Sequence, residues 1–153
     1  MHRLAIVIPA YKGAFLTKTL ESLAGQTNQN FTVYVGNDAG EDDIEEIVNQ
    51  FRDRLSIQYQ YFEYNLGSTS LVKQWERCFG LTKEEEWLWL LPDDDYADPE
   101  CVDLFYNHLQ KNYFDLFRFN VRFVTADGKV FKTNAALPDI QPAFDSLMDK
   151  LSF

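Results

Sequence analysis

The feature that most constrains the fold of this chain is a fourfold alternation of short apolar runs with stretches of helical periodicity. Each run has the length and apolar character of a buried strand, and each is followed by apolar residues spaced three and four apart. The predicted strands cover 4–8, 31–35, 56–62 and 87–91, and the predicted helices cover 14–24, 44–55, 71–79 and 99–111. This alternation predicts an α/β fold with a mainly parallel, doubly wound sheet and helices on both of its faces.

The C-terminal part of the sequence shows a different pattern. Two strand-like segments, 117–124 and 130–133, flank Ala126-Asp127-Gly128-Lys129, which predicts a β-hairpin. Residues 142–151 then show helical spacing. Because 153 residues suit one domain with a sizeable core, we expect a single domain over 1–153.

Composition excludes several functional classes. Apolar residues make up 46% of the chain, which fits a folded globular protein, and the formal net charge of −10 argues against a nucleic-acid partner. No apolar run is long enough for a transmembrane helix, and no apolar signal-peptide core follows the N-terminus. We therefore expect a cytoplasmic location, with a peripheral position at the inner face of the membrane as the alternative.

The loops after the strands are the predicted place for a ligand. Open parallel sheets bind ligands beyond the carboxyl ends of their strands, at the point where the strand order reverses. These loops are 9–12, 36–38, 64–67 and 92–95. If the order begins 3-2-1-4, the first and fourth strands are neighbours. Tyr11 and the aspartates after residue 91 then share one crevice, and Asp38 lies one strand away.

Three consecutive aspartates, Asp93, Asp94 and Asp95, follow the fourth predicted strand directly. An acidic triplet is usually a solvated loop, but carboxylates crowded at the end of a buried strand repel one another more strongly as the dielectric falls. A hard divalent cation relieves that repulsion, and carboxylate oxygens are ligands that Mg²⁺ and Mn²⁺ prefer. Because such sites leave several positions to water and substrate phosphates, the triplet favours a metal that bridges the protein to a diphosphate.

Other nucleotide-binding architectures do not fit. A dinucleotide-binding fold would show Gly-x-Gly-x-x-Gly after the first strand, where this chain has Pro-Ala-Tyr-Lys-Gly. A P-loop would need Gly-Lys-Ser or Gly-Lys-Thr, and neither occurs. A phosphoacceptor receiver domain would carry acids after the first and third strands, whereas these follow the second and fourth.

Four stretches taken in order resemble a known family. They are AIVIPAYKGAFLTKTLESLAGQT, FTVYVGNDAGEDD, NLGSTSLVKQWERCF and WLWLLPDDDYADPE. Together they are similar to the inverting glycosyltransferases of family 2, which have the Rossmann-like GT-A fold. The resemblance covers roughly residues 3 to 110.

The resemblance implies a role for eight residues. In the family, the loop that matches Pro9, Ala10 and Tyr11 contacts the nucleotide, and the aspartate that matches Asp38 accepts a hydrogen bond from the base. Asp94 falls on the metal-ligating aspartate and Asp95 on the acidic residue that often follows it. The remaining two assignments depart from the family pattern. Pro92 replaces the usual first aspartate, so Asp93 is expected to take its ribose or metal contact. In the family, the helix after Gly67 often carries an arginine and an asparagine. This chain has Lys73 and Gln74 there, which makes Lys73 the candidate for a diphosphate contact.

The resemblance also implies a reaction. A nucleotide-sugar, with UDP as the expected nucleotide, would bind through its diphosphate to Mn²⁺ or Mg²⁺, and a hydroxyl of a glycan or lipid-linked acceptor would attack with inversion. In the family the general base lies in a C-terminal half, so we expect this chain to be the donor-binding part, truncated before the acceptor and base region, and we name no base. Asp127, beside Gly128, is expected in a turn. A metal-dependent nucleotidyltransferase and a non-catalytic nucleotide-binding module of the same fold stay open as alternatives.

Overall fold

The structure is a computed structural model, and it describes residues 3–40, 43–110, 115–125, 127–134 and 141–142. The chain divides into two compact units, Met1–Asn112 and Tyr113–Phe153. Each unit is described by itself below.

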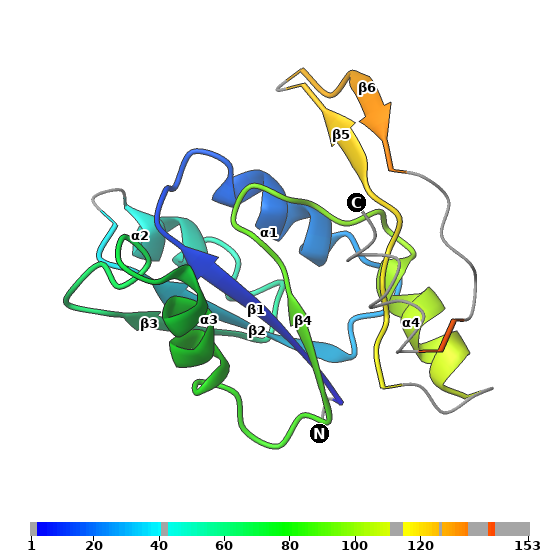
Figure 1. Ribbon diagram of the computed structural model, residues 1–153, viewed down its shortest axis with the longest axis horizontal. Helices are drawn as coiled ribbons and strands as arrows, with labels where there is room; N and C mark the ends of the chain where they lie inside the picture. Colours follow the sequence, from blue (N-terminus) through cyan, green and yellow to red (C-terminus); the bar gives the residue numbers. More distant parts are fainter. Residues whose placement is uncertain (1–2, 41–42, 111–114, 126, 135–140, 143–153) are drawn as a thin grey trace. The chain divides into compact units, whose positions relative to one another are not determined.

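Unit 1 alternates strand and helix throughout, as predicted (Figure 1). Its four strands form one parallel sheet in the order β3-β2-β1-β4, so the reversal of strand order predicted between the first and fourth strands is confirmed. The elements are β1 (Leu4–Ala10), α1 (Leu16–Ala24), β2 (Phe31–Asn37), α2 (Ile44–Asn49), β3 (Ile57–Tyr61), α3 (Leu71–Phe79), β4 (Trp87–Leu90) and α4 (Cys101–Leu109).

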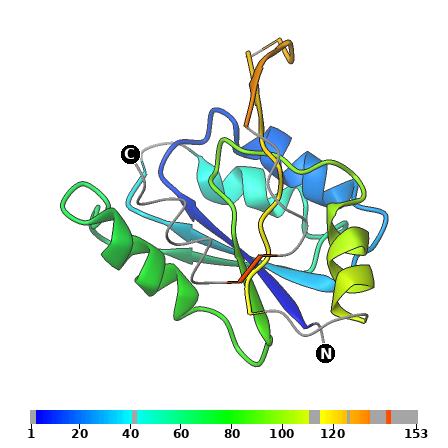
Figure 2. The same ribbon diagram turned by 45° about the vertical axis from the view of Figure 1, so that its right-hand side comes forward.

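Helices cover both faces of this sheet (Figures 1 and 2). Cys78 of α3 packs on Ala5, Val7 and Tyr34, so α3 covers the face to which these side chains point. The alternate residues of β1 and β2 are equally buried and point to the opposite face, where α1 and α2 contact each other. Trp87 pairs with Leu4 and shares this second face, where its ring meets Phe105 of α4. The two-sided core explains why the strands read as continuous apolar runs.

Strand β1 runs two residues further than its apolar run predicts, through Pro9 to Ala10. The carbonyl of Val7 accepts a hydrogen bond from Leu91 N–H, and the carbonyl of Ala10 accepts one from Asp38 N–H. The backbone N–H and C=O groups of odd-numbered residues in β1 therefore point to β4, and those of even-numbered residues point to β2. Pro9 therefore faces β4, whose pairing with β1 ends at Val7–Leu90. A proline is tolerated there because no ladder hydrogen bond requires its missing N–H.

Two predicted helix boundaries are wrong. The helix predicted over 44–55 ends at Asn49, although the buried stripe continues because hydrogen-bonded turns keep Phe51 and Leu55 in the core. The helix predicted over 99–111 begins only at Cys101, and the oxygen of the Gln26 side chain accepts from the Val102 N–H in its first turn. A tertiary contact has replaced the local cap.

Unit 2 contains the predicted hairpin, with β5 (Arg122–Val124) antiparallel to β6 (Val130–Thr133). The first strand is shorter than the predicted 117–124. Gly128 has a φ of 85°, which favours glycine, and the Asp127 carboxylate accepts from the Thr125 hydroxyl, so Asp127 is a turn residue as expected. The helix predicted over 142–151 lies, apart from Pro142, outside the described residues.

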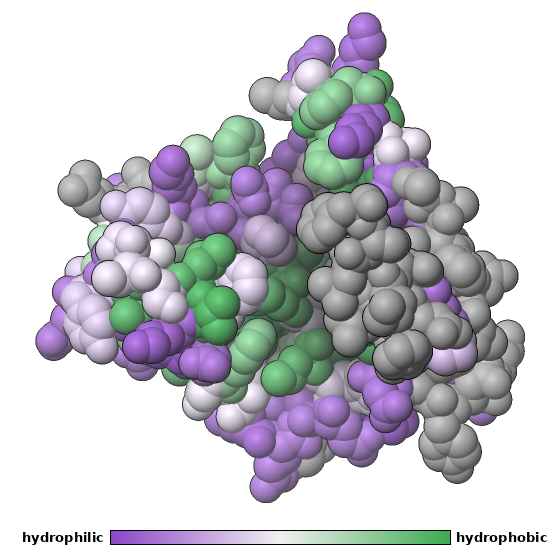
Figure 3. All heavy atoms as spheres, viewed as in Figure 1, coloured by the Kyte–Doolittle hydropathy of each residue, from purple (hydrophilic) through white to green (hydrophobic). Residues whose placement is uncertain are grey.

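The surface of unit 1 carries some apolar side chains. Leu71 and Val72 of α3 and Leu88 of β4 are exposed, and apolar atoms are visible around α3 and β4 in Figure 3. Among the helices that the structure describes, none has both the length and the apolar character needed to cross a bilayer.

Candidate functional site at the carboxyl ends of the strands

The loops after β1 and β4 are joined by one carboxylate. Oδ2 of Asp93 accepts hydrogen bonds from the backbone N–H groups of Tyr11, at 2.9 Å, and Lys12, at 3.2 Å. This contact forms because β1 and β4 are adjacent and parallel, so both chains leave the sheet at the same edge. The structure therefore brings Tyr11 and Asp93 together, at the edge of the sheet that the strand order 3-2-1-4 implies.

The neighbouring carboxylates are placed differently. Asp94 and Asp95 are exposed, and both belong to the turn that is closed by the bond from Asp95 N–H to the Pro92 carbonyl. Partial desolvation raises the pKa of Asp93, against the lowering effect of the Tyr11 and Lys12 amides, and partial desolvation raises the pKa of Asp95; the charge of Asp94 raises both further. These carboxylates therefore repel one another, which is the electrostatic condition a cation would relieve.

The described residues do not by themselves form a complete set of metal ligands. Within the described residues, no group of three or more His, Cys, Asp or Glu side chains is arranged to hold a metal ion. Two neighbouring exposed carboxylates, Asp94 and Asp95, do suit Mg²⁺ or Mn²⁺ that takes its other ligands from water and phosphate oxygens. The predicted metal roles of Asp94 and Asp95 stay predictions.

The raised pKa of Asp93 predicts a particular pH dependence of stability. The folded chain holds the Asp93 proton more tightly than the unfolded chain does. Protonated Asp93 therefore contributes its full stabilisation at pH values below the ordinary pKa of 3.8, and this contribution is lost as the pH rises through the raised pKa of the folded chain. In EDTA, the unfolding free energy of Asp93→Asn relative to wild type should therefore rise with pH across this window. Urea titrations at several acidic pH values measure it. A difference that does not change with pH would contradict the assignment.

The loop after β2 is tied equally closely to the loop after β1. Asp38 N–H donates to the Ala10 carbonyl at 2.8 Å, and Gly40 lies so near β1 that a Cβ there would be 2.3 Å from the Tyr11 carbonyl oxygen. Gly40 N–H also donates to the buried Asn37 side chain, at 2.8 Å. Pro9, Ala10 and Tyr11 are thus held between the two acidic loops, and the Tyr11 side chain is exposed.

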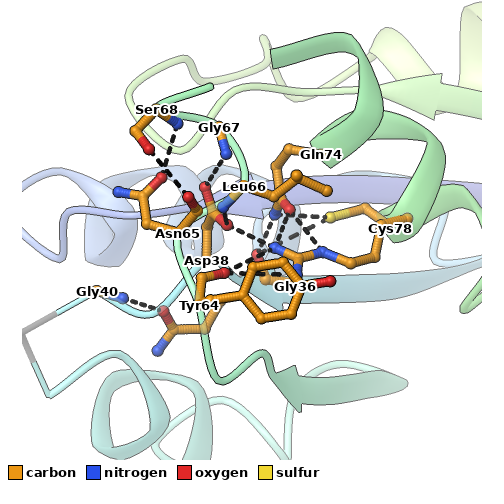
Figure 4. Close-up of polar contacts among 12 residues, drawn as sticks. Gly36, Asp38, Gly40, Tyr64, Asn65, Leu66, Gly67, Ser68, Gln74 and Cys78 are labelled. Atoms are coloured by element: carbon orange, nitrogen blue, oxygen red, sulfur yellow. Dashed lines mark hydrogen bonds and ion pairs between the residues drawn. The ribbon is translucent and has the colours of Figure 1, made fainter. Parts of the chain in front are cut away.

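Asp38 is buried, and its carboxylate is already occupied within the chain (Figure 4). Oδ1 accepts from Leu66 N–H at 2.7 Å, and Oδ2 accepts from Gly67 N–H at 2.8 Å. The guanidinium of Arg77 forms an ion pair with Oδ1 at 2.5 Å. Asp38 therefore fastens the loop after β3 to the end of β2, and its predicted contact with a base stays a prediction.

Arg77 is the residue that sequence reasoning missed. The predicted cation of this helix, Lys73, is exposed in the first turn of α3, where its backbone N–H donates to the N-cap Ser70. Arg77 lies four residues later, donates to the Gln74 side chain and stacks on Phe62 with its Cζ 3.8 Å from the ring centroid. The sequence does contain a signal for Arg77. It lies three residues after Gln74 and next to Cys78, on the side of the helix that was predicted to pack on the sheet.

Comparison with known proteins identifies the family that matches this arrangement. The model of glycosyl transferase family 2 matches residues 5–148, almost the whole chain. The chain belongs to glycosyltransferase family 2. The resemblance drawn from the four sequence stretches is therefore confirmed, and the match extends beyond residue 110 to include the hairpin.

Curated relatives of this family 2 chain are much longer than it is. A validoxylamine A glucosyltransferase of Streptomyces hygroscopicus subsp. jinggangensis is 40% identical over 67 residues, which cover 42% of this chain and 16% of that protein. An uncharacterized glycosyltransferase of Rickettsia bellii is 26% identical over 133 residues, covering 86% of this chain and 18% of that protein. The matched part of the chain thus spans less than a fifth of the length of each of these relatives.

Solved structures confirm the fold. The crystal structure of S. aureus TarS superposes with a TM-score of 0.65 at 24% identity, covering 72% of this chain and 20% of TarS. A structure of TarS residues 1–349 in complex with UDP-GlcNAc superposes equally well, covering 32% of that chain. The parallel Rossmann-like sheet and its helices are therefore those of a GT-A-type family 2 glycosyltransferase.

Proposed function

We propose that this chain forms the donor-binding part of an inverting glycosyltransferase that uses a UDP-sugar together with Mn²⁺ or Mg²⁺. The observation that carries the proposal is the junction of β1 and β4, where Asp93 binds two backbone amides of the β1 loop and Asp94 and Asp95 stay exposed beside it. Family membership and the TarS complexes with UDP and UDP-GlcNAc support a nucleotide-sugar ligand.

In this proposal, different residues of the chain contact different parts of the donor. Asp94 and Asp95 would hold the cation, which when bound would neutralise charge on the departing nucleoside diphosphate. Asp93 sets the distance between the loop that carries these carboxylates and the loop of Pro9, Ala10 and Tyr11. The exposed Tyr11 ring offers a surface for the nucleoside, while the exposed Lys73 offers a charge for the diphosphate. Attack by a glycan or lipid-linked acceptor would also need a general base, which we do not assign among the described residues.

The experiment that tests this proposal is calorimetry of UDP binding with Mn²⁺ and with EDTA. Binding should depend on the cation, and UDP at ~100 times its dissociation constant should raise the unfolding free energy by roughly 2.7 kcal/mol. Asp94→Asn should abolish the response to Mn²⁺ because it removes a carboxylate ligand. In EDTA the same substitution should raise the unfolding free energy slightly, by no more than about 0.5 kcal/mol, because it relieves repulsion with Asp93 and Asp95 at an exposed position.

The matched control is Asp53→Asn, which removes the same charge from an exposed turn after α2. It should bind UDP with Mn²⁺ as the wild type does. Equal affinity of the wild type for UDP in EDTA and in Mn²⁺ would overturn the proposed metal site.

A further inference from the structure

Three polar side chains of α1 and the turn after it point at the loop that carries the aspartates. Thr19, Ser22 and Gln26 are spaced three and four residues apart, so they lie along one side of the helix and continue beyond its end. Thr19 and Gln26 are 1% and 5% exposed. We call these three residues the polar ladder, and residues 92–98 the acid loop.

Every member of the polar ladder bonds to the backbone of the acid loop or its immediate continuation. The Thr19 hydroxyl donates to the Asp93 carbonyl at 3.0 Å, and the Ser22 hydroxyl accepts from Ala97 N–H at 3.1 Å. The Gln26 amide donates to the Asp98 carbonyl at 2.8 Å, and its oxygen accepts from Val102 N–H at 3.1 Å. The acid loop is therefore held at its beginning, near its end and at its exit into α4.

The chemistry of these bonds argues for positioning rather than for general stabilisation. Leu16, Leu20 and Leu23 already supply the apolar contact of α1 with the core. Burying a polar side chain instead costs free energy unless its hydrogen bonds are made, so each polar member gains little net stability but requires one loop geometry. Because the partners are all backbone groups, the ladder constrains the path of the acid loop without bonding to the carboxylates of Asp94 and Asp95.

We propose that Thr19, Ser22 and Gln26 are positioning residues of the donor site, which hold the acid loop in the conformation that presents Asp94 and Asp95 to a cation shared with a nucleoside diphosphate. This inference rests on the function proposed above. It assigns no direct contact with the donor to the ladder, because the hydroxyl and amide groups of its members are engaged with the backbone.

The sharpest test replaces Thr19 in two ways. Thr19→Val keeps the shape of the buried side chain and removes the hydroxyl, whereas Thr19→Ser keeps the hydroxyl and removes a methyl group. With Mn²⁺ present, Thr19→Val should weaken UDP binding about fivefold, the equivalent of one neutral hydrogen bond, and Thr19→Ser should bind within about twofold of wild type. Thr17→Val, at an exposed position of the same helix, is the matched control and should bind as the wild type does.

A second measurement follows the loop without any nucleotide. Hydrogen exchange of residues 93–98, read by mass spectrometry in EDTA, should be faster in Thr19→Val than in either Thr19→Ser or Thr17→Val. Circular dichroism of each variant confirms that it is folded at the temperature used.

The outcomes separate the inference from the function on which it rests. Weakened binding and faster exchange confined to Thr19→Val would support the ladder. A wild type that binds UDP with Mn²⁺, with Thr19→Val indistinguishable from Thr17→Val in both measurements, would overturn the ladder and leave the proposed function intact. A wild type that does not bind UDP would overturn the proposed function, and with it the positioning role, even if exchange in the loop still responds to Thr19→Val.

Discussion

Replacing Arg77 by methionine is expected to lower the unfolding free energy of this chain by about 3 kcal/mol. The guanidinium is 2.5 Å from Oδ1 of Asp38, and the two side chains are only 15% and 5% exposed. Methionine keeps much of the apolar length of arginine, so the main loss is the charge partner of a buried carboxylate. Removing one member of a buried pair costs about 3–5 kcal/mol, and the lower end applies because the Leu66 and Gly67 amides still bind Asp38.

The Arg77 prediction has a matched control in the same chain. Arg3 and Glu86 also form an ion pair at 2.5 Å, but their side chains are 50% and 58% exposed. Arg3→Met should therefore lower the unfolding free energy far less than Arg77→Met does, because an ion pair in solvent contributes little. Urea denaturation of both variants measures the contrast, and equal losses would show that burial of the Arg77 pair has no energetic consequence.

A double-mutant cycle identifies the cause of the loss. If the penalty of Arg77→Met comes from an unpaired carboxylate at Asp38, it should shrink when residue 38 is already neutral, as in Asp38→Asn. The double variant should then be more stable than the sum of the two single changes predicts. Strict additivity would mean that Arg77 contributes through its stacking on Phe62 rather than through its charge.

The second large effect is expected for Gly40→Ala. A Cβ at this position would lie 2.3 Å from the Tyr11 carbonyl oxygen and 3.0 Å from Cδ1 of Ile44, so the backbone itself must move. Overpacking of this kind typically costs about 1–3 kcal/mol, and we expect about 2 kcal/mol because the nearest atom is a backbone oxygen rather than the end of a flexible side chain.

The same substitution should also disturb the donor site. The Tyr11 carbonyl belongs to the peptide unit whose N–H is that of Lys12, and this N–H donates to Asp93. Since a peptide unit is planar, displacing the carbonyl oxygen rotates the N–H as well. UDP affinity with Mn²⁺ should fall together with stability. Gly80→Ala, at the C-terminal cap of α3 with φ of −62°, is the control, and it should change neither quantity much. Full UDP affinity in Gly40→Ala would show that the Asp93 contact is not needed for binding.

Local sequence patterns were sufficient for the architecture of unit 1. Runs such as 4–8 and helical stripes such as 71–79 require only short-range periodicity, and their alternation limits the chain to a parallel sheet with right-handed crossovers. The same reasoning placed Tyr11 and Asp93 at one edge, because parallel strands send all their following loops to the same side. Turn chemistry likewise placed Gly128 correctly, since its requirement for positive φ is local.

Only the tertiary structure decided which partner each polar side chain takes. Asp38 looked free to bind a ligand, but α3 crosses the sheet so that Arg77, 39 positions later in the chain, reaches its carboxylate. A helix was predicted from residue 99, but α4 begins at Cys101 and its first turn is capped by the side chain of Gln26, 76 positions before Val102 in the chain. These pairings join residues far apart in sequence, and several compatible partners exist for each polar group. The periodicity of a sequence determines which face a residue occupies, whereas the partner on that face depends on how the packed elements are placed in space.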